Sequence, residues 1–401
     1  MTGGSGLSPR RLDRMRDVMS GHVAAGRVPG VVTLVARHGE VHADAIGTTT
    51  AGGTDPVRRD TLFRISSMTK PVTAVAALIL VEECRLRLDE PVDGLLPELA
   101  GRRVLRAPDA PVGDTVPARR PITVRDVLDF RLGLGMILEE AAFAYPIYDA
   151  ARELGITGFG PPAPDSPHSP DEWMRLLGTL PLVHQPGERW LYNIGSYVLG
   201  VLISRVAGQP LETFLRERIF EPLGMKDTGF TVPAGDLDRL PAAYHPAQDG
   251  SGTLEPHDVP EDSAWSREPA FPDGGAGLVS TADDYLAFAR MLLNEGVHEG
   301  ERILSRPAVE LMTTDQLTAE QRLDAFGGSA GWGFGVSVGT HRDNLWATPG
   351  RYGWDGGLGT SWYNDPDEDL VAILMTQRSG FPTQNPVWLD FWTSVYQAVV
   401  D

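Results

Sequence analysis

The chain has 401 residues, 42% of them hydrophobic, which suits a large globular protein with two lobes rather than one simple core. Its formal net charge of −19 at pH 7 and pI near 4.9 argue against nucleic acid or an anionic membrane as a partner. No apolar run reaches the length of a membrane span, and residues 1–11 lack the apolar segment of a signal peptide.

The cysteine and histidine content bears on the cellular location and on metal binding. The single cysteine, Cys84, cannot form an internal disulfide, which is consistent with a cytoplasmic location, and we expect it to be a buried filler rather than a nucleophile. The nine histidines show no metal-ligand spacing, so we expect neither a metal nor another cofactor. Nothing in the sequence indicates an oligomeric state.

The first elements predicted along the chain are a helix, a hairpin and a buried helix. Residues 8–25 carry one apolar stripe at helical spacing. Residues 31–36 and 41–46 are typical of two strands joined by a turn. The apolar, alanine-rich run at residues 72–81 predicts a helix that is buried all round.

The rest of the chain divides into a helical middle and a region where strands return. Three helices are expected in the proline-rich middle, at residues 124–130, 173–180 and 211–219. A further helix at 283–294 has Thr281 as its expected cap. Three strands and a last helix are expected after it, at residues 333–338, 360–364, 370–376 and 385–399.

These elements predict an α+β fold. The economical arrangement is an antiparallel sheet built from both ends of the chain and flanked by helices, with a mostly helical second lobe. The first lobe would be discontinuous, comprising residues 1–88 and 274–401, and residues 89–273 would form the second.

Ser67 and Lys70 are the first candidates for chemistry. Lys70 is one of only two lysines, and a desolvated lysine, unlike arginine, can lose its proton and act as a base. Because Pro71 is tolerated only in a first helical turn, the helix should begin close to Ser67. Positions three apart then place the hydroxyl and the amine side by side at a helix N-terminus. The alternative is a capping serine with a solvated lysine.

Tyr192 is the third candidate. It follows a Pro186-Gly187 turn and precedes an apolar helix. A phenol placed against Lys70 can carry a proton to or from Ser67 and the leaving group. The ordinary alternative is a tyrosine of the core or its rim.

A glycine-dense segment at residues 352–360 leads into a predicted strand. Glycine allows backbone to approach a ligand closely. The N–H groups of Gly357 and Ser67 are therefore candidates for an oxyanion hole. A simple glycine turn with Trp354 as packing is the alternative.

Together, these motifs resemble those of the serine β-lactamase and penicillin-recognising superfamily, and most closely its class C-like carboxylesterases, the family VIII esterases. Five segments spread over nearly the whole chain carry the resemblance: Ser67-x-x-Lys70, Pro186-Gly-Glu-x-Trp-x-Tyr192, Pro222-Leu-Gly-Met-x-Asp-Thr228, Gly275-Ala-Gly-Leu-Val-Ser-Thr-Ala-Asp-Asp284 and Trp354-x-Gly356. The resemblance implies a β-lactamase-like fold and an acyl-enzyme route. Ser67 would attack, Lys70 and Tyr192 would share the proton work, and water or an alcohol would resolve the acyl-serine.

Two departures from the class C pattern bear on the substrate. Ile194 replaces the asparagine of Tyr-x-Asn, and Trp354-Asp355-Gly356 replaces Lys-Thr-Gly. The lysine of that third motif normally binds the carboxylate of a β-lactam, and no lysine follows Lys226 here. We therefore expect an uncharged small-molecule ester as the substrate, with Trp354, Gly356 and Ile194 in its binding site.

An aromatic and apolar segment follows Gly135 and is a second candidate for substrate contacts. Its members are Met136, Ile137, Leu138, Phe143, Tyr145, Ile147, Tyr148 and Phe159. Such a segment can line an acyl or alcohol pocket, and Tyr148 is the contact we expect there. It can equally be the core of the helical lobe.

Ser329 is a rival nucleophile, since Gly327-Gly-Ser-Ala-Gly331 matches the Gly-x-Ser-x-Gly pattern of α/β-hydrolases. That motif needs a strand before it and a helix after it, whereas here a polar stretch precedes it and a strand pattern follows. His341 is the only histidine downstream, with no acid between it and Ser329. We expect a flexible glycine loop.

The sequence thus predicts a cytoplasmic serine carboxylesterase. Acyl transfer to an alcohol, amidase action and weak β-lactamase action are alternatives that use the same acyl-enzyme. A ligand-binding relative without turnover is the alternative of a different class.

Overall fold

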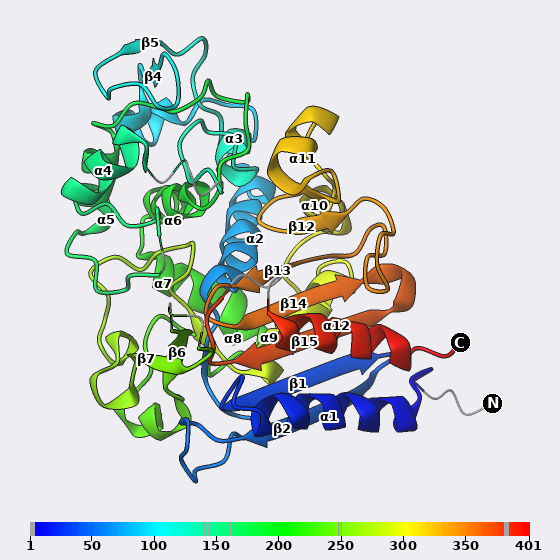
Figure 1. Ribbon diagram of the computed structural model, residues 1–401. Helices are drawn as coiled ribbons and strands as arrows, with labels where there is room; N and C mark the ends of the chain where they lie inside the picture. The colour runs from blue at the N-terminus through cyan, green and yellow to red at the C-terminus, as the bar shows by residue number, and fades with distance from the viewer. Residues whose placement is uncertain are drawn as a thin grey trace.

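A computed structural model describes residues 5–138, 142, 144–160, 162–247, 249, 251–380 and 385–401. Its centre is a seven-stranded antiparallel sheet in the order β11-β12-β13-β14-β15-β1-β2 (Figure 1). The two ends of the chain meet where β1 pairs with β15, in a register that runs from Val31 opposite Thr376 to Arg37 opposite Leu370. The predicted sheet of both chain ends is confirmed.

The strands of this sheet are β1 (Gly30–Arg37), β2 (Glu40–Gly47), β11 (Ala330–Trp332), β12 (Ser337–Gly339), β13 (Tyr352–Gly356), β14 (Thr360–Asp365) and β15 (Leu370–Thr376). The strand predicted at 333–338 is wrong over most of its length, because residues 333–336 form the turn between β11 and β12. Gly335 has a φ of +73°, and a Cβ on Gly333 would lie 2.1 Å from the Met312 carbonyl oxygen. These backbone contacts turn the chain where the apolar pattern alone favours a strand.

Helices cover both faces of the sheet. On one face, α1 (Pro9–Ala24) and α12 (Pro386–Ala398) lie side by side, in blue and red in Figure 1. On the other face lies α9 (Ala282–Leu293), whose cap Thr281 accepts a hydrogen bond from the Asp284 N–H at 3.2 Å, as predicted. Because both faces are buried, β1 and β15 are buried at every position.

The middle of the chain forms helices away from the sheet. They are α3 (Val124–Leu128), α4 (Pro146–Glu153), α5 (Pro170–Leu177), α6 (Ile194–Ala207), α7 (Leu211–Leu215) and α8 (Glu221–Leu223), with a π-helical turn at Arg216–Phe220. Four strands pair in this region, β4 (Arg103–Leu105) with β5 (Thr115–Pro117) and β6 (Ala243–Pro246) with β7 (Leu254–Asp258). The buried helix α2 (Thr69–Glu82) packs against α6 and so joins this region to the sheet.

The remaining elements lie near the sheet. They are β3 (Phe63–Arg64) paired with β8 (Val279–Ser280), β9 (Val297–His298) paired with β10 (Glu301–Arg302), α10 (Arg306–Met312) and α11 (Ala319–Phe326). Sequence reasoning missed α11, although Thr318 and Gln321 form a capping box at its start. Among the described residues, no helix is both long and apolar enough to cross a membrane.

Cys84 corrects one expectation. It is exposed rather than buried, because it lies in the turn after α2 with a φ of +58° instead of on the helix. The apolar run that precedes it buries α2 but ends before this residue.

Candidate active site

Ser67 lies in a short 3₁₀ turn, Ser66–Met68, that leads directly into α2. Ser66 has a φ of +47°, a left-handed conformation that a non-glycine residue keeps only where its surroundings impose it. The preceding residue supplies that constraint from two sides. The Ile65 N–H donates to the Leu278 oxygen at 3.0 Å, and the Ile65 oxygen accepts from Thr360 Oγ1 at 3.1 Å.

Lys70 is fully buried beside this turn. Its Nζ is hydrogen-bonded to Ser67 Oγ at 2.9 Å and to the Gly275 oxygen at 2.7 Å. Burial lowers the pKa of Lys70 to about 7, against the opposing influence of Asp273. The structure therefore brings the predicted hydroxyl and amine together, and the alternative of a solvated lysine is wrong.

Tyr192 approaches Ser67 from the other side. Its hydroxyl donates to Ser67 Oγ at 2.8 Å and accepts from the Trp354 indole N–H at 3.0 Å. Lys70 Nζ lies 4.7 Å from the centre of the tyrosine ring. Burial raises the pKa of Tyr192 to about 12, so the phenol is protonated at neutral pH.

The backbone around Tyr192 fixes this position. Its N–H and carbonyl both pair with Met136, at 2.9 and 2.8 Å. The next residue, Asn193, has a φ of +83° and a ψ of −56°, and the Ile194 N–H closes a three-residue turn onto the Tyr192 oxygen at 3.1 Å. Helix α6 begins at once after this turn, so the phenol stands at its N-terminal end.

The end of β13 lies beside the serine turn. A Cβ on Gly356 would lie 2.4 Å from the Ile65 oxygen, so only glycine allows this approach. Gly357, which is exposed, would carry a Cβ 3.9 Å from Ser66 Oγ, and its oxygen accepts from the Gly380 N–H at 3.2 Å. The residue expected to complete the oxyanion hole is therefore next to the turn that carries Ser67.

A glycine-rich segment that contains Asp273 supplies the other side of the lysine site. Asp273 Oδ1 accepts from the N–H groups of Gly275 and Ala276 at 3.0 and 2.6 Å. A Cβ on Gly275 would lie 2.3 Å from the Tyr197 ring, so the segment passes close against α6. Sequence reasoning matched this motif to the family but gave Asp273 no role; the adjacent glycines signal close packing, and nothing local signals a carboxylate near Lys70.

An aromatic cluster encloses the phenol. Its members are Phe130, Trp190, Tyr192, Phe326, Trp332 and Trp354. The Trp332 and Trp354 rings meet edge to face with their centres 4.7 Å apart. Sequence reasoning found only the tyrosine and Trp354, because the other members come from distant segments that share no periodicity. The cluster excludes water from one side of the site and so contributes to the burial that shifts both pKa values.

Two expected substrate contacts are corrected. Ile194 is fully buried, and its Cδ1 would lie 2.8 Å from a Cβ on Gly158, so it packs inside the helical region. Tyr148 is 4% exposed, and its hydroxyl donates to the Gly135 oxygen at 3.2 Å and accepts from the Ile137 N–H at 2.9 Å. Neither side chain offers surface to a ligand. Tyr148 instead holds the segment that pairs with Tyr192.

The part of the aromatic segment around Tyr148 therefore belongs to the core of the helical region. Ile147 is fully buried with Tyr148 in the main core, whereas Leu138 is 45% exposed. Phe143 lies outside the described residues.

The rival serine is unsuited to catalysis. Ser329 is exposed, and its Oγ donates to the Phe326 oxygen at 2.8 Å. A helix, α11, precedes it and a strand, β11, follows, which is the reverse of a nucleophile elbow.

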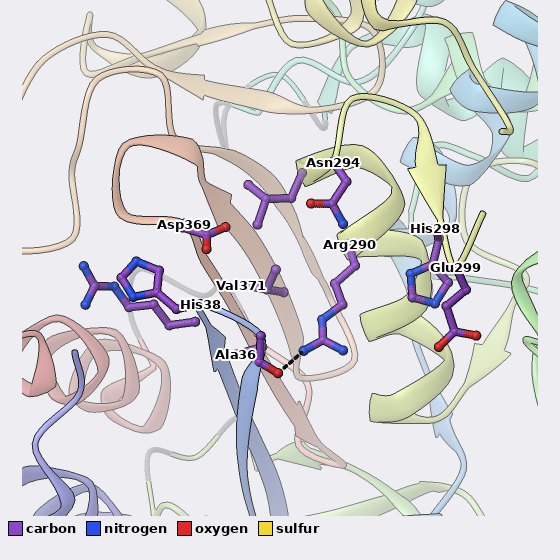
Figure 2. A pocket seen from close by; sticks show the side chains of 11 residues that line it. Ala36, His38, Arg290, Asn294, His298, Glu299, Asp369 and Val371 are labelled. Atoms are coloured by element: carbon purple, nitrogen blue, oxygen red, sulfur yellow. Dashed lines mark hydrogen bonds between the residues drawn. The ribbon is translucent and has the colours of Figure 1, made fainter. Parts of the chain in front are cut away.

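A cavity of about 320 Å³ lies away from this site, at the turn between β1 and β2 and the end of α9 (Figure 2). Both arginines that line it already have partners. Arg37 pairs with Glu368 and Asp401, and Arg290 donates to the Gly39 oxygen at 3.3 Å. None of the residues that line this cavity belongs to the serine site.

The chain is similar over most of its length to a family model and to known proteins. The family model described as Beta-lactamase matches residues 15–396. Esterase EstB of Burkholderia gladioli is 34% identical over 392 residues, covering 92% of this chain and 91% of EstB. The uncharacterized protein MT1414 of Mycobacterium tuberculosis is 40% identical over 365 residues, covering 88% of this chain and 87% of that protein.

A solved structure gives the same relationship. EstCE1, described as a hydrolase with promiscuous acyltransferase activity, superposes with a TM-score of 0.78 at 28% identity. The match covers 96% of this chain and 99% of EstCE1.

Proposed function

Because the chain belongs to the β-lactamase family, we propose that it is a serine carboxylesterase of the family VIII type, acting through an acyl-serine on Ser67. One observation carries this proposal: Ser67 Oγ is hydrogen-bonded to both Lys70 Nζ and the Tyr192 hydroxyl. A nucleophile in contact with two proton-transferring groups is the arrangement that covalent ester cleavage needs.

Lys70 is the general base of this proposal. With a pKa of about 7 it is partly neutral at physiological pH, and its Nζ is within reach of the serine proton. Tyr192, with a pKa of about 12, is protonated and suited to act as the acid. In acylation, Lys70 takes the Ser67 proton, Oγ attacks the ester carbonyl, and Tyr192 gives its proton to the departing alkoxide.

Deacylation restores both groups. The tyrosinate left by the first step accepts a hydrogen bond from the Trp354 indole N–H, which stabilises the negative charge. The tyrosinate then takes a proton from water, the hydroxide attacks the acyl carbonyl, and Ser67 Oγ leaves with the proton held by Lys70. The sum is ester plus water giving acid plus alcohol, with no proton left over.

The substrate of this proposal is an uncharged small-molecule ester. The backbone N–H groups of Ser67 and Gly357 would donate to the oxyanion of the tetrahedral intermediate. Trp354, which is half-buried, stands where the class C relatives have a lysine. Its indole contributes apolar surface and a hydrogen bond to Tyr192 rather than a cation for a carboxylate.

Acyl transfer to an alcohol is the second candidate function. EstCE1, a structural neighbour over nearly the whole chain, is described as having both activities. The acyl-serine step is common to hydrolysis and transfer, as it is to amidase and weak β-lactamase action, and the acceptor distinguishes the first two.

The test is hydrolysis of short p-nitrophenyl esters by the native protein, Ser67→Ala and Ser329→Ala, with a chromogenic cephalosporin in parallel. We expect activity to be lost only in Ser67→Ala, with little turnover of the cephalosporin. Assays with added alcohol then separate hydrolysis from transfer. Loss only in Ser329→Ala contradicts the mechanism. A native protein that is inert and does not react with a fluorophosphonate favours a binding role.

A further inference from the structure

Asp273 is a buried carboxylate close to the proposed base, and the mechanism above does not use it. It is 3% exposed, and burial raises its pKa to about 6, against the hydrogen bonds of Ala276 and Gly275 and the charge of Lys70. Burying a carboxylate costs free energy unless the group is hydrogen-bonded or paired with a charge. The backbone of residues 275–276 links this carboxylate to Lys70, and this arrangement suggests two roles for it.

The first purpose is mechanical. Asp273 Oδ1 accepts from the N–H groups of Gly275 and Ala276, and the Gly275 oxygen in turn accepts from Lys70 Nζ. The carboxylate therefore orients the peptide group that holds the amine. Thr73 Oγ1 donates to the Gly274 oxygen at 2.8 Å and fixes the same segment to α2.

The second purpose is electrostatic, and it depends on which other groups near Lys70 carry charge. Tyr192 and Tyr285 contact the Ser67–Lys70 turn, and Tyr197 from α6 packs against Gly275; burial raises the pKa of each, so all three are neutral. Ser67 and Trp354 complete the surroundings without charge.

Asp355 lies on the opposite face of β13, where burial raises its pKa against three hydrogen bonds and the charge of Arg351. Among the described residues, Asp273 is thus the charged group that influences Lys70, and its negative charge favours the ammonium form.

We propose that Asp273 is a positioning residue of the active site, whose carboxylate orients the Gly275 peptide and whose charge sets how readily Lys70 accepts a proton from Ser67. This inference rests on the proposed function for its catalytic meaning. The hydrogen bonds that link Asp273 to Lys70 through the Gly275–Ala276 peptide, and the influence of its charge on the amine, do not depend on that function.

Asp273→Asn separates the two purposes. Both backbone bonds go to Oδ1, so an asparagine oxygen can accept them while the charge is removed. Asp273→Ala removes the bonds as well. Asp284→Asn is the matched control, because Asp284 is also a buried carboxylate with a pKa of about 6 that accepts from backbone, at Asp227, but it lies at the start of α9.

The composition of the chain makes Lys70 directly observable. With only two lysines, protein labelled with carbon-13 at the lysine side-chain ε carbon gives two resonances, and Lys226→Arg assigns them. Lys226 is exposed and serves as an internal reference. We expect the Lys70 resonance of the native protein to titrate near pH 7. In Asp273→Asn its midpoint should fall by about one pH unit, since removing a nearby negative charge disfavours the ammonium form.

In Asp273→Asn, the acid limb of the pH profile of kcat/KM should shift to lower pH together with the Lys70 midpoint. In Asp284→Asn, the acid limb should stay where it is in the native protein. Unchanged Lys70 titration in a folded Asp273→Asn protein overturns the inference. Activity that does not depend on Ser67, together with a shifted Lys70 resonance, overturns the proposed function while the electrostatic role stands. Should Asp273→Asn fail to fold, Asp273→Ser, whose hydroxyl oxygen can accept the same N–H groups, provides the same comparison.

Discussion

Trp354 and Asp355 are neighbours on β13, and their side chains point to opposite faces of the sheet. On the Asp355 face the carboxylate accepts from Ser361 Oγ at 2.5 Å, Trp388 Nε1 at 2.7 Å and Tyr363 OH at 2.9 Å. Arg351 stacks on the Tyr363 ring at 3.7 Å and offsets the charge. Three donors and Arg351 thus stabilise this charge, although burial still raises the pKa of Asp355.

On the Trp354 face the enclosed cation is Lys70, and its contacts are neutral. It meets a hydroxyl, a peptide oxygen and the face of the Tyr192 ring, with Asp273 acting through the Gly275 peptide. Because the partners do not compensate the charge, the proton of Lys70 is held weakly and can be exchanged. Burial opposes both charges, and the two sites differ in their partners: Asp355 has three donors and a nearby cation, whereas Lys70 has only neutral contacts.

Among the tests of this comparison, Lys70→Met should have the largest effect. Methionine preserves the volume but removes the base, so ester hydrolysis should fall by at least about a thousandfold. The unfolded chain binds the lysine proton up to its ordinary pKa, whereas the folded protein releases it at about 7, so the buried amine opposes folding at neutral pH. The free energy of unfolding at pH 7 should therefore rise by roughly 1–3 kcal/mol in urea titrations.

Lys226→Met is the control for that experiment. Its lysine is exposed, so neither hydrolysis nor the free energy of unfolding should change appreciably. Retained hydrolysis in Lys70→Met would remove Lys70 from the mechanism, and a loss of stability would show that its charge is compensated after all.

The pH dependence of the native protein is the next largest effect. Lys70 must be neutral to accept the Ser67 proton, so kcat/KM should fall about tenfold per pH unit below pH 7 and about a hundredfold by pH 5. With the pKa of Tyr192 at about 12, no alkaline limb is expected between pH 7 and pH 10. A bell-shaped pH profile of kcat/KM with an alkaline limb near neutrality would instead show that the acid is a group other than Tyr192.

Asp355→Asn tests the face of β13 on which the carboxylate has three donors. The amide cannot accept from all three donors, and Arg351 loses its counter-charge, so the free energy of unfolding should fall by about 2 kcal/mol. Hydrolysis per folded molecule should change less than about threefold, because the carboxylate points away from Ser67. A large loss of kcat with unchanged stability would contradict the division between the two faces.

Patterns along the chain predicted much of the fold because they report local geometry. β15 was bounded correctly at 370–376, and the cap of α9 was found at Thr281. The Ser67–Lys70 pair followed from helix spacing and Pro71, which are also local. The buried contacts of Ile194 and the aromatic cluster depend on segments that meet only in the folded chain. The same is true of Asp273, whose importance arises from a peptide group that it shares with Lys70.

Two tryptophan substitutions give the smallest and most closely matched effects. Trp354 donates to Tyr192 OH at 3.0 Å on one face of the sheet, and Trp388 donates to Asp355 Oδ1 at 2.7 Å on the other. Phenylalanine in either place keeps a ring and removes one N–H. Trp354→Phe should lower kcat about tenfold, since the tyrosinate formed in acylation loses its donor, with little change in the free energy of unfolding.

Trp388→Phe should do the opposite. It should lower the free energy of unfolding by about 1 kcal/mol and leave kcat unchanged, because Asp355 keeps Ser361 and Tyr363 as donors. Measuring kcat and urea unfolding on both variants in parallel shows which hydrogen bond contributes to catalysis and which to stability. If Trp354→Phe, like Trp388→Phe, lowers only the free energy of unfolding and leaves kcat unchanged, the indole of Trp354 has no part in stabilising the tyrosinate.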